Sequence, residues 1–427
     1  MTGHASRRGI LKSAAHVAAL GALTFNPVGS ASAREQSALR AGATSKIDAL
    51  LRAAVEAGNL PGVVAMAADD SGIIYEGAFG SRRLPDGEPM TRDTVFRVAS
   101  MIKPITTVAA LQLVERGKLF LDAPVPPIEP ALGAPQVLDG FDEKGRPQLR
   151  PPKRPILLRD LLTHTSGFAY RLWDAKGVKY GEALARIPAK ERKNFPPTPL
   201  MFDPGERWQY GGGIDWVGRL VEFVSGESLD VYFRQHIFDP LGIHDTAFVI
   251  TAAQQAREAS GHRRMPDGSL TAQPRERQMP QHRFSGGGGI YSTAPDYLAF
   301  ILMLLNGGVG GGARILRPET VALMGRNQIG KLEAGRMHTT SPQFSNDVDF
   351  FPGISLKWGF GHMINMQAIP GGRSAGSLTW GGLFNTYYWI DPQKRIAAVF
   401  LTQIVPFADP RALNAYGAFE RAIYAGI

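Results

Sequence analysis

The chain of 427 residues contains no cysteine, and this absence excludes several kinds of site. A protein without cysteine forms no disulfide, has no thiol nucleophile and offers no thiolate to a metal ion. The nine histidines are spread along the chain, and none stands in an H-E-x-x-H pattern. We therefore expect neither a metal site nor a cofactor.

Long apolar runs and clusters of basic residues are also missing after the first 33 positions. No later stretch is long and apolar enough for a transmembrane helix, so we expect no stable membrane anchor. The formal net charge is +9, but the basic residues are scattered and do not alternate with aromatic residues. This pattern favours a small-molecule substrate and excludes a nucleic acid as the expected partner.

Residues 1–33 have the features of an export signal, in the expected order. Residues 6–12 read SRRGILK, which matches the twin-arginine signature, and residues 13–25 are mildly apolar. Residues 31–33 read ASA, which fits a cleavage site for a signal peptidase. A disordered basic tail is the alternative. The order of the three features instead predicts a twin-arginine signal peptide and a periplasmic or secreted mature protein.

The most informative segment holds Ser100 and Lys103, where an extended apolar run over 95–98 leads into a predicted helix. Residues three apart on a helix share a face, so the amine can reach the hydroxyl. Free N–H groups at a helix start stabilise an oxyanion, and a nearby base activates a serine nucleophile. An N-cap serine followed by a solvated lysine is the alternative, because S-x-x-K alone occurs by chance.

The periodicity of the remaining chain predicts the order of helices and strands. Helical patterns cover 45–57, 157–162, 216–224, 229–237, 294–305 and 411–424, and strand patterns cover 61–67, 72–77, 358–364, 378–381, 385–390 and 395–402. The segment 125–155 is rich in proline, glycine and charge, which is typical of a long surface excursion.

Strands near both ends, around a helical middle, predict an α+β fold. In it, one antiparallel sheet is built from both termini and flanked by helices, with an inserted, mostly helical lobe. Because the chain is long for a single compact domain, we expect two lobes. Residues 34–98 and 345–427 are assigned to the sheet lobe and 99–344 to the helical lobe, with the active site between them.

Four further motifs accompany the serine and the lysine. Residues 204–210 read PGERWQY and deliver Tyr210 just before a helix, and residues 380–382 read WGG at a strand end. Residues 161–167 read LLTHTSG, and residues 286–293 read GGGGIYST. In this order and spacing, the motifs resemble those of the serine β-lactamase and penicillin-binding-protein superfamily. Within it the chain is most similar to the family VIII carboxylesterases, relatives of the class C β-lactamases, and the resemblance covers nearly all of the mature chain.

The resemblance implies a β-lactamase/transpeptidase-like fold and a role for each matched residue. Ser100 corresponds to the acylated nucleophile, and Lys103 to its base or proton relay. Tyr210 corresponds to the tyrosine that shares the proton shuttle and activates water. The backbone N–H groups of Ser100 and Leu383 correspond to the oxyanion hole, which is usually the largest contribution to acyl transfer.

The substrate-binding motifs depart from the class C pattern. Gly212 stands where those enzymes have the asparagine of Tyr-x-Asn, and Trp380, Gly381 and Gly382 stand in place of Lys-Thr-Gly. Glycines allow a substrate to lie against bare backbone, and the tryptophan offers an apolar wall. The missing amide and cation bear on the choice of substrate and favour a small or medium carboxylic ester.

Two other residues look functional at first sight. Ser374 lies in the sequence GRSAG, the nucleophile elbow of α/β-hydrolases, but that fold needs a later histidine and none follows His362. We therefore interpret Ser374 as a loop residue. His164, in the turn 163–167, is interpreted as structural.

The leading hypothesis is an exported serine esterase that forms an acyl-enzyme on Ser100. A β-lactamase, a D-amino-acid amidase or peptidase, and an acyltransferase using the same site remain open alternatives. A non-catalytic binding protein is disfavoured, because Ser100, Lys103 and Tyr210 are all intact.

The twin-arginine interpretation predicts the outcome of a fractionation experiment. Changing both Arg7 and Arg8 to lysine should leave uncleaved protein in the cytoplasm, because that export route reads the arginine pair. Immunoblots of cytoplasmic and periplasmic fractions measure this. Mature protein in the periplasm of the double variant would contradict the interpretation.

Overall fold

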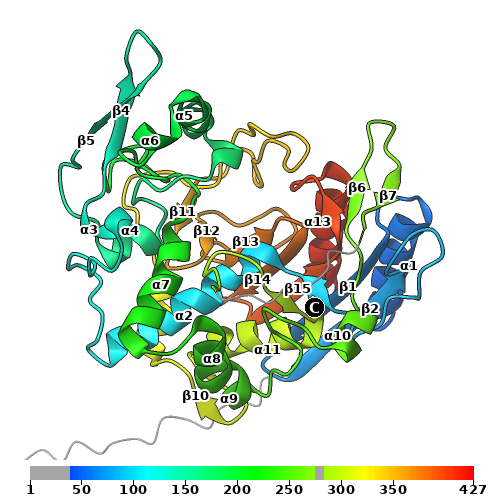
Figure 1. The fold of residues 1–427 in the computed structure, drawn as a ribbon. Helices are drawn as coiled ribbons and strands as arrows, with labels where there is room; N and C mark the ends of the chain where they lie inside the picture. Colours follow the sequence, from blue (N-terminus) through cyan, green and yellow to red (C-terminus); the bar gives the residue numbers. More distant parts are fainter. Residues whose placement is uncertain (1–38, 275–282) are drawn as a thin grey trace, which may run out of the picture. The chain divides into compact units, whose positions relative to one another are not determined.

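The centre of the fold is a seven-stranded sheet in the order β11-β12-β13-β14-β15-β1-β2 (Figure 1). The computed structural model describes residues 39–274 and 283–427. Every pair of neighbouring strands in the sheet is antiparallel. The strands are β1 (Gly62–Asp69), β2 (Gly72–Gly80), β11 (Leu356–Trp358), β12 (Met363–Asn365), β13 (Leu378–Gly382), β14 (Thr386–Asp391) and β15 (Ile396–Leu401). Because β1 pairs with β15, the sheet is built from both ends of the chain, as predicted.

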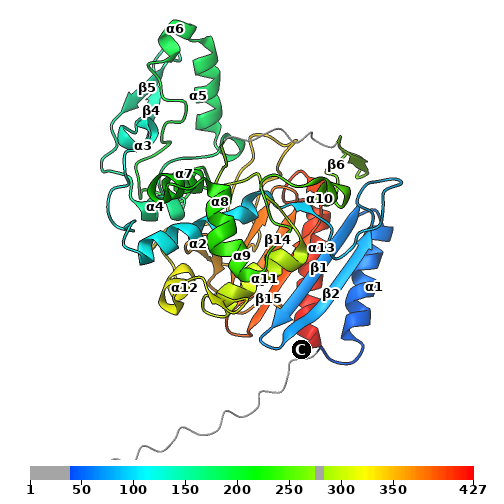
Figure 2. The same cartoon turned by 60° about the horizontal axis from the view of Figure 1, so that its bottom comes forward.

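Successive side chains of β14 point to opposite faces of the sheet, and each face is covered by helices. Tyr387 and Trp389 point to one face, where they pack on Tyr416 of α13 (Pro410–Gly426). Tyr388, between them, points to the other face and packs on Tyr297 of α11 (Ala294–Leu305). Helix α1 (Ala43–Glu56) lies beside α13, and Figure 2 shows this pair and α11 on opposite faces. The α+β fold class is thereby confirmed.

Helix α2 (Ile102–Glu115) passes through the interior and carries the predicted catalytic pair at its start. Every side chain from Ile102 to Leu113 is buried, which is why the helix is apolar on all sides. It packs against α7 (Gly213–Ser225), and Gly117, with φ of 68°, follows its end. The predicted helix therefore forms where expected.

Most of the remaining elements are short. The other α-helices are α3 (Pro130–Gly133), α4 (Leu158–Leu162), α5 (Ala175–Arg186), α6 (Ala189–Arg192), α8 (Leu229–Phe233), α9 (Asp239–Leu241), α10 (Ala252–Ala256) and α12 (Pro318–Met324). The short strands are β3 (Phe96–Arg97), β4 (Val137–Phe141), β5 (Pro147–Arg150), β6 (His262–Arg264), β7 (Leu270–Ala272), β8 (Tyr291–Ser292), β9 (Val309–Gly310), β10 (Ala313–Arg314) and β16 (Ile404–Val405). The 3₁₀ helices are η1 (Ala99–Met101) and η2 (Arg171–Trp173), and η3 (Arg234–Phe238) is a π-helix.

The segment 125–155, predicted as a long surface excursion, is mostly exposed or half-buried and contains a hairpin of β4 and β5. The Asp142 carboxylate fixes the turn by accepting hydrogen bonds from the Lys144 and Arg146 N–H groups.

One prediction about local structure is wrong. The single strand predicted at 358–364 is two strands, β11 and β12. Between them Gly361 has φ of 80°, a conformation that reverses the chain and that glycine adopts without strain.

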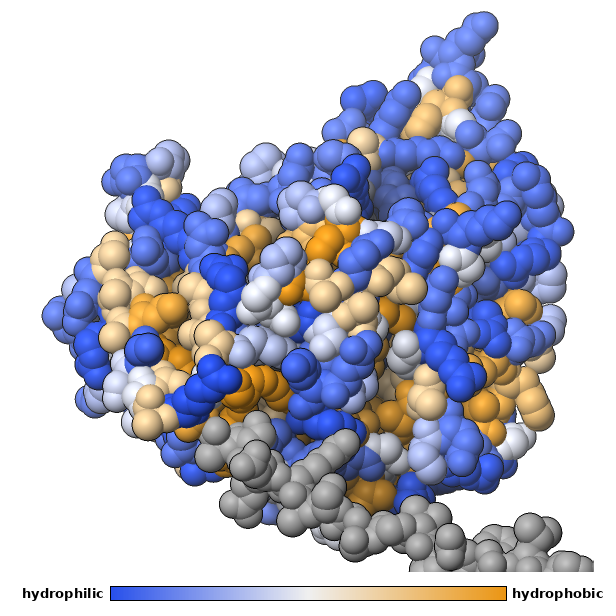
Figure 3. All heavy atoms as spheres, turned by 180° about the vertical axis from the view of Figure 1, so that it is seen from behind, coloured by the Kyte–Doolittle hydropathy of each residue, from blue (hydrophilic) through white to orange (hydrophobic). Residues whose placement is uncertain are grey.

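The described surface is mixed in character. Figure 3 shows apolar residues interspersed among hydrophilic ones on the face opposite to that of Figure 1. Within the described ranges, no helix is long and apolar enough to cross a membrane. Residues from 39 onward belong to one compact unit. In it, α11, from the predicted helical lobe, lies against β1 and β15, so the division into two lobes stays a prediction. The predicted signal peptide lies outside the described residues.

Strand β13 ends against the backbone that leads to Ser100, and this contact requires glycine. A Cβ atom on Gly382 would lie 2.2 Å from the Val98 carbonyl oxygen and 2.4 Å from Oγ1 of Thr386. Gly382→Ala should therefore lower the free energy of unfolding by about 1–3 kcal/mol, the usual cost of overpacking. Urea unfolding measures this, with Gly140→Ala as the control, because a Cβ at Gly140 meets nothing within 4 Å. Equal stability of Gly382→Ala and the wild type would contradict the argument.

Candidate active site

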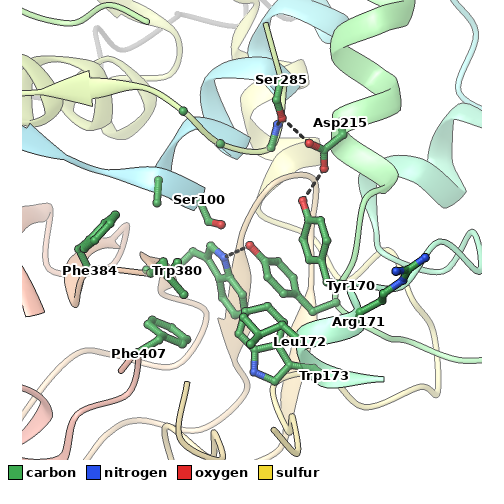
Figure 4. A pocket seen from close by; sticks show the side chains of 17 residues that line it. Ser100, Tyr170, Arg171, Leu172, Trp173, Asp215, Ser285, Trp380, Phe384 and Phe407 are labelled. Atoms are coloured by element: carbon green, nitrogen blue, oxygen red, sulfur yellow. Dashed lines mark hydrogen bonds between the residues drawn. The ribbon is translucent and has the colours of Figure 1, made fainter. Parts of the chain in front are cut away.

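Ser100 lies in η1, directly before α2, and its side chain faces a cavity (Figure 4). The residue before it, Ala99, has φ of 44°, in the left-handed region that costs a residue with a Cβ about 1–2 kcal/mol. Such strain persists only where the surrounding structure enforces it, and it is concentrated at functional sites. Sequence patterns gave no sign of this strain at Ala99.

Lys103 lies one helical turn after Ser100, and its side chain is completely buried. Its Nζ atom is 3.1 Å from Ser100 Oγ and donates a hydrogen bond of 2.7 Å to the Gly287 carbonyl oxygen. The same atom lies 4.9 Å from the ring centre of Tyr210 and 5.3 Å from that of Tyr170. The predicted contact between the amine and the hydroxyl is therefore present in the structure.

Tyr210 comes from the loop before α7 and is held among aromatic rings. Its hydroxyl oxygen accepts a hydrogen bond of 3.2 Å from Nε1 of Trp380 (Figure 4). Its ring packs on His164 and Trp173, with ring centres 4.8 and 5.3 Å away. Among the described residues, no hydrogen bond joins the Tyr210 hydroxyl to Lys103. The proton shuttle assigned to Tyr210 thus stays a prediction, supported by the proximity of Lys103 to its ring.

His164 supports Tyr210 and does not line the cavity. Its Nδ1 accepts a long hydrogen bond of 3.4 Å from the Gly211 N–H. Burial and the nearby Lys103 lower the pKa of the imidazole well below its ordinary value. A neutral, buried ring is consistent with the structural role expected for His164.

The cavity in front of Ser100 has a volume of about 470 Å³ and is lined mostly by apolar side chains. The aromatic and aliphatic residues that line it are Ala99, Tyr170, Leu172, Trp173, Tyr210, Trp380, Leu383, Phe384 and Phe407. Leu383 and Gly381 line it together with Ser100, so the structure brings together both segments of the predicted oxyanion hole. The role of the two backbone N–H groups stays a prediction.

Two glycines predicted to bind substrate do not line this cavity. Gly382 lies against the Val98 carbonyl, so the lack of a side chain is required by packing at this position. Gly212 lines an adjoining cavity of about 350 Å³, which shares Tyr170, Arg171 and Asp215 with the first. Substrate binding by Gly212 and Gly382 stays a prediction.

A polar network that no sequence motif indicated lies at one end of the cavity. The Tyr170 and Ser285 hydroxyls each donate a short hydrogen bond to the Asp215 carboxylate (Figure 4). Ser285 also accepts a hydrogen bond of 3.0 Å from the N–H of Gly287, whose carbonyl binds Lys103. Burial and the Asp215 carboxylate raise the pKa of the Tyr170 phenol well above its ordinary value, so the phenol stays protonated.

Two members of this network, Tyr170 and Asp215, lie close in the sequence to the motifs, and this proximity is the feature that could have indicated them. Tyr170 follows the LLTHTSG segment by three residues, and Asp215 follows Tyr210 by five. Asp215 lies in the first turn of α7, where the helix dipole favours a carboxylate. Neither residue belongs to a motif by itself, which is why the sequence alone did not single them out.

The alternative serine, Ser374, lies in the loop between β12 and β13, outside the cavity. Its N–H donates to the Asp391 carboxylate. Its neighbour Arg373 is buried in an ion pair with Glu420 of α13. The loop-residue interpretation is therefore confirmed. In the part of the chain that the structure describes, no cluster of three or more His, Cys, Asp or Glu residues could hold a metal ion.

A family model described as Beta-lactamase matches residues 47–423. The chain belongs to this family. It is 33% identical over 377 residues to the lovastatin esterase of Penicillium rubens, a match that covers 84% of this chain and 92% of the esterase.

Solved structures agree with the family assignment. Simvastatin synthase from Aspergillus terreus superposes with a TM-score of 0.78 at 32% identity, covering 90% of this chain and 98% of that one. EstCE1, described as a hydrolase with promiscuous acyltransferase activity, gives 0.69 at 25% identity, covering 90% and 98%. The β-lactamase/transpeptidase-like fold and the predicted resemblance are thereby confirmed. The chain is an enzyme of the serine hydrolase and acyltransferase type, with relatives that include esterases and acyltransferases.

The position of Tyr210 predicts how removal of its hydroxyl affects turnover. Tyr210→Phe keeps the ring contacts but removes the oxygen, so kcat should fall roughly 10²-fold, as on loss of general acid–base catalysis. KM should change little, because the cavity wall is unchanged. Stopped assays with a p-nitrophenyl ester measure both constants.

Tyr75→Phe is the matched control for that substitution. Tyr75 is also buried and hydrogen-bonded, to Asp48, but lies on β2 outside the cavity. It should keep normal kinetics. Near-normal kcat in Tyr210→Phe would mean that its hydroxyl is idle in the reaction.

Proposed function

We propose that this enzyme hydrolyses small or medium carboxylic esters through an acyl-enzyme on Ser100. The observation that supports this most strongly is the 3.1 Å contact between Ser100 Oγ and the completely buried Nζ of Lys103. A serine is a weak nucleophile unless a base takes its proton as it attacks. The distance from Nζ to Oγ and the hydrogen bond that holds Nζ at Gly287 support Lys103 as the base that takes this proton.

The proposed reaction has two balanced steps. Ser100 Oγ attacks the ester carbonyl carbon while its proton passes to Lys103, and the N–H groups of Ser100 and Leu383 bind the oxyanion. The intermediate collapses, and the alcohol leaves with a proton returned through Lys103 and Tyr210. Water then attacks the acyl carbon while its proton is relayed through Tyr210 and Lys103 to Ser100 Oγ. The bond between Oγ and the acyl carbon breaks, and the carboxylic acid leaves with Ser100 protonated again.

The character of the cavity supports a neutral ester as substrate. Its volume of about 470 Å³ suits a small or medium ligand, and its aromatic and aliphatic wall gains by packing on alkyl and aryl groups. Trp380 stands where relatives that bind a carboxylate carry a cation. Its N–H is also engaged by Tyr210 and offers no charge to a substrate.

Acyl transfer to an alcohol is a second candidate. The adjoining cavity of about 350 Å³ shares Tyr170, Arg171 and Asp215 with the first and offers room for an acceptor. EstCE1, by its description, combines hydrolysis with acyl transfer. Mass spectrometry of the products formed from a vinyl ester plus a primary alcohol separates the two: a new ester indicates transfer, and free acid alone indicates hydrolysis.

We also propose that the reaction takes place after export, in the periplasm or outside the cell. The support is the sequence alone, namely the arginine pair and the ASA segment within residues 1–33.

The proposed function predicts a preference for esters over β-lactams. A carboxylate that loses a charge-assisted hydrogen bond forfeits about 1.5–3 kcal/mol, or roughly ten- to hundredfold in affinity. Short-chain p-nitrophenyl esters should therefore be turned over readily, and nitrocefin slowly or not at all. Ser100→Ala should lower ester turnover by several orders of magnitude, because it removes the hydroxyl that forms the acyl-enzyme.

Comparison of kcat/KM across an ester panel, benzylpenicillin and nitrocefin tests this preference. A kcat/KM for benzylpenicillin or nitrocefin equal to or above that of every ester would contradict the predicted preference for esters. Persistent ester turnover by Ser100→Ala would contradict the assignment of the nucleophile.

A further inference from the structure

One end of the cavity carries the Asp215 carboxylate, which forms no ion pair with another of the described residues (Figure 4). Asp215 lines the cavity, and its two oxygens accept hydrogen bonds from the neutral hydroxyls of Tyr170 and Ser285. These bonds orient the carboxylate without cancelling its charge. A carboxylate has about four acceptor positions, so it can still accept further hydrogen bonds from a ligand.

The cations near this end are directed elsewhere. Arg171 is the other charged residue among the described residues that line the cavity, but Figure 4 shows its guanidinium pointing away from Ser100. That group lies against α5, where Gly181 would place a Cβ 2.7 Å from its Nη1. Lys103 is held by Gly287 and Ser100 behind the cavity wall. Arg219 and Arg283 line a neighbouring surface pocket with Asp215, where Arg219 is paired with Glu129 and Glu222 and Arg283 is exposed. Among the described residues, the hydrogen bonds to Asp215 therefore come from neutral hydroxyls and not from a cation.

Aromatic rings stand beside the carboxylate. Tyr170 and Trp173 both line the cavity, with ring centres 6.3 Å apart. An aromatic wall next to a carboxylate is the chemistry that recognises an ammonium group, through cation–π attraction and charge.

We propose that the Asp215 end of the cavity binds a positively charged group of the substrate, such as a quaternary ammonium, and disfavours carboxylates. This proposal rests on the proposed ester hydrolysis and specifies the substrate as an ester with a positively charged group. Asp215 contacts the distant group of the substrate and leaves the reacting atoms to Ser100 and Lys103.

A pair of isosteric esters tests the proposal. Butyrylcholine and 3,3-dimethylbutyl butyrate have the same shape, but only the first carries a positive charge. The ratio of their kcat/KM values, charged over neutral, should exceed one in the wild type. It should fall roughly tenfold in Asp215→Asn, which removes the charge and keeps the shape, and should remain above one in Asp215→Glu.

The chain offers a matched control on a neighbouring helix. Asp230 also lies in the first turn of a helix, α8, and also accepts a serine hydroxyl, but it is outside the cavity. Asp230→Asn should leave the ratio unchanged. If Asp215→Asn does not fold by circular dichroism, Asp215→Ser takes its place in the same comparison.

Two results would overturn the proposal. One is a wild-type ratio at or below one, and the other is a ratio in Asp215→Asn within twofold of the wild type. Calorimetric titration of both esters into Ser100→Ala, which binds but does not react, separates this proposal from the proposed function. Tighter, Asp215-dependent binding of butyrylcholine supports the charge selection even if no ester is hydrolysed. Ester turnover with equal binding of both refutes the charge selection alone.

Discussion

The site depends on the burial of the Lys103 amine. A group of this polarity, fully removed from water, is tolerated only with hydrogen-bond partners, and the Gly287 carbonyl and Ser100 Oγ supply them. One turn along α2, the Thr106 hydroxyl donates to the Gly286 carbonyl at 2.7 Å. Two successive carbonyls of the glycine loop are thus tied to the helix that carries the nucleophile, so base, nucleophile and loop form one unit.

The glycine loop also links that unit to the polar end of the cavity. A Cβ on Gly286 would lie 2.5 Å from the Ile214 carbonyl oxygen, and one on Gly287 would lie 2.4 Å from an Asp215 carboxylate oxygen. Side chains at these positions would push α7 away from α2. Because the glycine loop lies so close to α7, Asp215 lines the same cavity as Ser100. The loop therefore fixes the position of the Asp215 carboxylate relative to Lys103.

The sequence predicted those features of the fold and the site that depend on the spacing of residues along the chain. Ser100 and Lys103 meet because three residues separate them on a helix, and strand patterns at both ends foretold a sheet built from both termini. The network of Tyr170, Asp215 and Ser285 escaped prediction, since its members are far apart and no spacing rule joins them. The close packing of Gly382 on Val98 could not be predicted either, because it depends on two segments that are far apart in the sequence.

The central claim is that Ser100 is the acylated residue, and mass spectrometry tests it most directly. The protein is incubated with a fluorophosphonate or a slowly hydrolysed ester, and its intact mass and peptide masses are measured. The account predicts one adduct, on the peptide that contains Ser100, and none in Ser100→Ala. An adduct on the peptide that contains Ser374, or a wild type that forms no adduct, would contradict it.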